Sequence, residues 1–261
     1  ILGCWLLLSV LALELCYLFA LLAEYYNAWR WLGWALVPSA YLLLVSSRWT
    51  QPWPLREFGH EYRRDAAAPV ALLMLAWFWL ANAFSNGAAD PLPYIPLVNP
   101  LEIGLLLVLF ALYRWGQYCL VPEAHNPRAT EASLQALLGL SLFALLTMAV
   151  CRAVHHLFGV PFRIHALGNS MLVQAGLSLL WTLLALALMV AGTRLKRRDL
   201  WFSGGILVGI VVVKMFFIEL GNSGSLERII SFIGVGVLLL VVGYFSPLPP
   251  RRSEAETETL A

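Results

Sequence analysis

The chain has 261 residues, of which 61% are hydrophobic and 12% are charged. Soluble domains average about 45–50% apolar and about 25% charged residues, so this composition excludes an ordinary water-soluble domain. The formal net charge of +2, without a long basic run, excludes nucleic acid as a partner.

Long apolar runs organise the chain. A helix needs about 20 apolar residues to cross a membrane. Eight segments qualify, at residues 3–23, 29–46, 69–85, 101–119, 134–151, 171–192, 201–220 and 229–246. We predict an all-α fold: a polytopic membrane helical bundle of about eight transmembrane helices over residues 1–246, with a disordered cytoplasmic tail at 247–261. Ile1 already lies in an apolar run, so we expect further helices of the same protein to precede it.

Basic residues predict the orientation of the helices. Connections 47–67 and 193–200 each carry four of them, whereas the connections on the opposite side carry few. By the positive-inside rule, this asymmetry places both termini in the cytoplasm.

The segment between the third and fourth predicted helices is rich in proline. Its prolines at 91, 93, 96 and 100 predict an extended course rather than a helix. Asn99-Pro100-Leu101-Glu102 has the N-cap, the N1 proline and the N3 carboxylate of a helix start. Tyr94 and Ile95 are expected to rest this segment on the outer membrane surface.

Residues 147–182 are unusually polar for this chain and supply the candidate site. The outer connection at their centre holds arginines and histidines, and the next helix carries a polar residue at every fourth position from Ser170 to Thr182. Such a stripe should face other helices or a wet cavity. The candidate ligand-binding residues are Arg152, His155, His156, Arg163, His165, Gln174, Ser178 and Lys214. We expect all of these except His165 and Ser178 to converge near the outer surface.

Three interpretations of this region remain open. The polar side chains could be structural and bond to neighbouring helices. They could instead form an anion site, because arginine suits phosphate and carboxylate groups and a helix N-terminus favours negative charge. A metal site on His155, His156 and His165 is the third, although adjacent histidines on a helix point in different directions. No metal or cofactor is predicted, and the catalytic residues, if any, are unknown.

Two features inside the predicted spans add further expectations. Glu14 lies near the middle of the first helix, where a carboxylate needs a partner or takes part in a proton relay. Lys214 either reaches outward to water, pairs with Glu102, Glu219 or Glu227, or joins the polar cluster. Gly205 and Gly209 have the four-residue spacing that allows close helix packing.

The sequence also resembles a known family. The segments LPYIPLVNPLE, VHHLFGVPF, LVQAGLSLLWTLLALALM and LERIISFIGVGVLLLVVGYFSPLPP resemble the C-terminal part of a family of large bacterial membrane proteins of unknown function. The resemblance covers about residues 86–250 and is most specific in 226–250. It implies an N-terminal coiled coil followed by many transmembrane helices, an inner-membrane location, and no established activity.

Three classes of function are compatible with these features. The first is binding or processing of an anionic envelope lipid or a lipid-linked glycan at the outer leaflet. The second is a transporter or channel-like component, and the third is a membrane scaffold without a small-molecule ligand. Whether the protein is an enzyme is left open. The expected partners are membrane lipids, an anionic lipid or glycan carrier, and the missing N-terminal helices.

The predicted orientation is tested by cysteine labelling in intact cells. Cysteines introduced at Asn86 or Gly159 should react with a membrane-impermeant reagent, because both positions lie in outward-facing connections. Cysteines at Arg63 and Arg198 should not react. The reverse pattern would show that the orientation is inverted.

Overall fold

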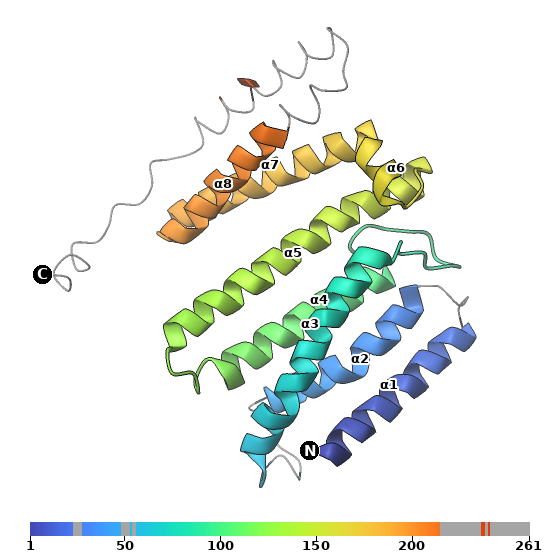
Figure 1. Cartoon of the computed structure of the whole chain (residues 1–261), viewed down its shortest axis with the longest axis vertical. Helices are drawn as coiled ribbons and strands as arrows, with labels where there is room; N and C mark the ends of the chain where they lie inside the picture. Colours follow the sequence, from blue (N-terminus) through green and yellow to red (C-terminus); the bar gives the residue numbers. More distant parts are fainter. Residues whose placement is uncertain (23–27, 48–52, 54–55, 215–235, 238–239, 241–261) are drawn as a thin grey trace, which may run out of the picture. The chain divides into compact units, whose positions relative to one another are not determined.

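The computed structural model describes residues 1–22, 28–47, 53, 56–214, 236–237 and 240 (Figure 1). The helices are α1 (Leu2–Leu22), α2 (Ala28–Val45), α3 (Ala67–Phe84), α4 (Pro100–Trp115), α5 (Pro127–Phe158), α6 (Ile164–Asn169), α7 (Met171–Arg194) and α8 (Arg198–Lys214), with π-helical turns η1 (Glu61–Ala66) and η2 (Gly116–Leu120). Seven of the eight predicted segments coincide with α1–α5, α7 and α8; segment 229–246 lies almost wholly outside the described residues. So do Glu219, Glu227 and the predicted tail.

The described residues form an all-helical membrane bundle. Five helical stretches are long and apolar enough to cross a membrane: Leu2–Leu21, Glu61–Phe84, Pro100–Leu120, Pro127–Phe158 and Met171–Arg194. Helix α2 is less apolar because it carries Arg30, three tryptophans and Pro38. The chain divides into two compact units, Ile1–Leu167 and Gly168–Ala261, each of which is described by itself.

In the first unit, α2 packs against α1 on one side and α4 on the other (Figure 1). The centre is apolar: the side chains of four residues, one from each of α2–α5, are fully buried there, namely Leu42, Phe78, Leu105 and Leu145. Half of the apolar stretch of α4 is buried but only 11% of that of α1, so α4 is central and α1 is peripheral.

Three aromatic side chains donate hydrogen bonds to the π-helical turn η1, which precedes α3. Trp5 of α1 donates to the carbonyl of Ala66 (3.0 Å), and Trp115 of α4 donates to that of Arg63 (2.8 Å). Tyr41 of α2 donates to the carbonyl of Tyr62 (2.8 Å). These bonds give partners to three carbonyls of η1. An unpaired backbone polar group in lipid costs several kcal/mol, on the order of a lost hydrogen bond or more.

Helix α5 is longer than its predicted segment 134–151. Asn126 caps its start by accepting from the N–H of Ala129, and Gly159, in the left-handed region at φ 71°, ends it. At 1.5 Å per residue its 32 residues span about 48 Å, more than a hydrocarbon core of about 30 Å. Arg152, His155 and His156 therefore lie on a helix that projects beyond the core, and not in a connection.

In the second unit, α7 and α8 form an antiparallel pair with a very close contact. A Cβ added at Gly204 would lie 2.7 Å from the carbonyl oxygen of Ala185 and 2.6 Å from Cγ of Met189. The glycines at 205 and 209, whose spacing indicated close packing, meet nothing within 4 Å in the described part of the chain. The contact thus uses the neighbouring face of α8.

This contact makes adjacent glycines respond oppositely to alanine. Gly204→Ala should lower the free energy of unfolding by about 1–3 kcal/mol, because α7 and α8 must move apart to admit the methyl group. Gly205→Ala should be neutral or stabilising by up to about 1 kcal/mol, since it gains helix propensity in open space. Thermal unfolding in detergent measures both, and equal shifts would contradict the close contact.

Candidate functional site

A fully buried ion pair lies where α3, α4 and α5 meet. A terminal nitrogen of Arg152 is 3.2 Å from Oε1 of Glu102, and both side chains have no exposed surface. The guanidinium also donates to the carbonyl of Ser85 (3.1 Å) and to the carbonyl and side-chain oxygens of Asn82 (2.7 and 2.8 Å). A buried charge is tolerated when it is paired and hydrogen-bonded, and Arg152 meets both conditions.

The Glu102 carboxylate has two further donors from the proline-rich segment. The Tyr94 hydroxyl donates to Oε1 at 2.6 Å, and the backbone N–H of Leu97 donates to Oε2. Burial and this hydrogen bond to Glu102 raise the pKa of Tyr94, so the phenol stays a neutral donor. Glu102 is at the N3 position of α4, as the sequence predicts, and its carboxylate turns to Arg152.

The segment 85–99 is held tightly against this ion pair. It is not helical, as its prolines predict, and it includes a turn at residues 95–98 with Pro96 second and Leu97 at φ 66°. Gly87, at φ 77°, lies so close that an added Cβ would be 3.1 Å from Cδ of Arg152. Asn99 caps α4 and also donates to the carbonyl of Gly87 (2.8 Å). Tyr94 thus packs inward and does not rest on the membrane surface, whereas Ile95 is exposed.

The two adjacent histidines serve different local contacts. His156 Nε2 lies 2.9 Å from the carbonyl of Asn86, and its ring stacks on Tyr94 with centroids 4.6 Å apart. His155 Nδ1 lies 2.6 Å from the carbonyl of Val160. Within the described residues, no group of three metal-ligating side chains could hold an ion.

A groove of about 300 Å³ opens beside the ion pair. Its wall combines segment 88–94 with His156 and Leu157 at the end of α5. Asp90 and Leu92 are exposed there, while Tyr94 and His156 are half-buried. The groove therefore offers a carboxylate and an imidazole beside apolar surface, with Arg152 enclosed behind it.

The polar stripe of α7 contacts α8, as its spacing predicts. Lys214 is buried and donates to the carbonyl of Gln174 (2.9 Å) and to the Ser178 hydroxyl (2.7 Å). Thr182 donates back to the carbonyl of Ser178, and Ser170 caps α7. Lys214 thus joins the polar cluster, while its possible partners Glu219 and Glu227 lie outside the described residues.

The predicted site residues thus fall into two groups, one in each unit. Arg152, His155 and His156 belong to the first unit, whose Arg163 and His165 are exposed beyond α5. Gln174, Ser178 and Lys214 belong to the second. Convergence of the six residues for which it was expected stays a prediction. Sequence reasoning missed Asn82, Ser85 and Tyr94 as partners of the ion pair, since nothing local marks them.

The ion pair should dominate the stability of the first unit. Arg152→Met and Glu102→Gln should each cost roughly 3–5 kcal/mol, because each leaves one buried charge without its counter-charge. The double variant should cost much less than the sum of the two. Unfolding in detergent measures this cycle, with Arg56→Met at an exposed arginine as the control. Additive losses would show that the two side chains do not interact.

Comparison with known proteins agrees with this architecture. The sequence matches a family described as predicted membrane protein (DUF2339) over residues 1–249. This match also includes residues 1–85, ahead of the four segments that carry the resemblance. No protein of curated function and no solved structure matches the chain. Since the match covers nearly all 261 residues, the chain belongs to this family of membrane proteins of unknown function.

Proposed function

We propose that this protein resides in a bacterial inner membrane and binds a hydroxyl-rich lipid headgroup, such as that of a lipid-linked glycan, in the groove at residues 88–94 and His156. The charge asymmetry of the connections supports this location and an outer-leaflet position for the groove. The observation that carries the proposal is the groove itself. Its wall includes Asp90 and His156 and lies beside the buried ion pair of Arg152 and Glu102.

The chemistry of the lining favours hydrogen bonding over simple charge attraction. The carbonyl of Asn86 can only accept, so the proton of a neutral His156 ring sits on Nε2 and leaves Nδ1 as an acceptor. Asp90 adds carboxylate oxygens, and no arginine or lysine lines the groove. Sugar hydroxyls can donate to both groups.

An anionic part of such a ligand would meet Arg163 and not Arg152. The charge of Arg152 is balanced by Glu102 inside the protein, and neither side chain is exposed. Arg163 is exposed and lies four residues past Gly159, which ends α5 beside the groove. Arginine matches phosphate well, and lipid phosphates lie at this depth.

The alternatives have less support. Hydroxyls within the helices, such as those of Ser141 and Thr147, donate to carbonyls of their own helix, so their protons are not available to a polar conduit. One observation supports a scaffold without a ligand. The hydrogen bonds of Arg152 connect three helices and are made to groups of the protein itself.

Native mass spectrometry of the full-length protein with its lipids tests the proposal. Asp90→Asn and Arg163→Ala should each lose a co-purifying hydroxyl-rich lipid or glycan carrier that wild type retains. Arg56→Ala, an exposed arginine at the other end of α3, should retain it. Identical lipid profiles in all four proteins would favour the scaffold, and a divalent metal lost with His155→Ala would favour a metal site.

A further inference from the structure

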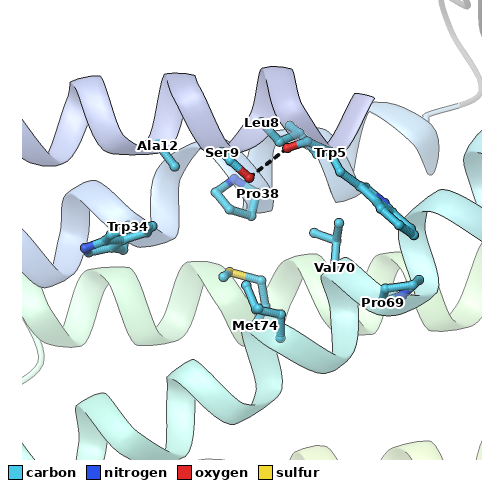
Figure 2. A pocket seen from close by; sticks show the side chains of 10 residues that line it. Trp5, Leu8, Ser9, Ala12, Trp34, Pro38, Pro69, Val70 and Met74 are labelled. Carbon is cyan, nitrogen blue, oxygen red and sulfur yellow. Dashed lines mark hydrogen bonds between the residues drawn. The ribbon is translucent and has the colours of Figure 1, made fainter. Parts of the chain in front are cut away.

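A second cavity lies at the opposite end of the first unit, between α1, α2 and α3 (Figure 2). It has a volume of about 220 Å³, and its walls include Trp5 and Ala12 of α1, Trp34 and Pro38 of α2, and Val70 and Met74 of α3. Figure 2 shows Pro38 between the side chains of α1 and those of α3. We call this space the α1–α3 cleft.

The cleft follows from small and rigid residues in the helices. The backbones of α1 and α2 approach closely at Gly33, where an added Cβ would lie 3.1 Å from Cα of Cys16. One turn earlier on α1, the buried Ala12 offers only a methyl group to fill the space facing Pro38. The proline ring is compact and cannot change rotamer to close the gap.

The lining selects an apolar occupant. None of its side chains is ionisable. The Ser9 hydroxyl donates to the carbonyl of Trp5 (2.8 Å), and the Trp5 indole donates to that of Ala66 (3.0 Å), so both groups are already bonded. Water needs two to four polar partners to occupy a cavity, roughly three on average, and these walls are almost entirely hydrocarbon.

The position of the cleft decides which apolar occupant is available. Its walls use the early part of α1 and α3 and the middle of α2, and Ser9, Pro69 and Leu73 at its edge are exposed. In a membrane these exposed residues border lipid tails. A helix with side chains is about 10–12 Å across and is too wide for this space. An unbranched hydrocarbon chain fits.

We propose that the α1–α3 cleft binds one acyl chain of a membrane lipid. By the predicted orientation, this lipid belongs to the cytoplasmic leaflet, on the opposite side from the groove at His156. The acyl chain packs against the indoles of Trp5 and Trp34 and the ring of Pro38. The two sites share no residue, so either can fail without the other.

Tryptophan quenching tests the proposal, because bromine on an acyl chain quenches only indoles that it touches. The full-length protein in detergent is titrated with a phospholipid brominated on its acyl chains. Wild type should show a saturable component of quenching from Trp5 and Trp34. Ala12→Phe should lose that component, because the ring fills the cleft, whereas Leu13→Phe at the neighbouring exposed position should keep it.

Two further results complete the test. Ser9→Phe, at the exposed edge of the cleft, should reduce the saturable component even if Ala12→Phe does not fold. Equal saturable quenching in wild type and both cleft variants overturns the proposal. Quenching of the wild type that rises in proportion to lipid without saturating also overturns it, and indicates either nonspecific contact or a protein segment in the cleft.

Discussion

The first unit depends on one buried pair of opposite charges. Both side chains are fully buried in the protein, and a guanidinium and a carboxylate can be enclosed there only when they are paired and hydrogen-bonded. Arg152 and Glu102 meet this condition through bonds to each other, to the end of α3 and to the proline-rich segment. The pair therefore sets where these elements lie, because each supplies bonds that the charges require.

This constraint determines what the outward groove can recognise. Because Glu102 neutralises its charge, Arg152 adds little attraction for anions. Its hydrogen bonds instead hold the elements behind the groove together. Tyr94 connects the two regions: its hydroxyl bonds to Glu102 while its ring stacks on His156 in the groove wall. For the proposed ligand, selectivity would depend on Asp90 and on His156, whose ring contacts Asn86 and Tyr94.

Local patterns in the sequence were enough to predict the helices but not their contacts. Apolar length located the spans, and Asn99-Pro100 marked the start of α4, because these signals lie within one element. The partner of Arg152 lies 50 residues away, and no local rule identifies it. Similarly, the spacing of Gly205 and Gly209 allowed close packing, yet the contact uses Gly204, since the face that meets α7 is set by tertiary packing.

The two ends of the first unit present different chemical groups to a lipid. At one end, Arg152, Glu102 and Tyr94 are bonded to one another, and the proposed headgroup would meet Asp90 and His156 at the groove wall. At the other, Trp5, Tyr41 and Trp115 direct their polar atoms to backbone carbonyls and leave apolar surface facing the helices. A single lipid cannot satisfy both environments with the same part of its structure. The polar end suits a headgroup and the apolar cleft suits a tail, and because they lie at opposite ends of the helices, they would engage lipids of opposite leaflets.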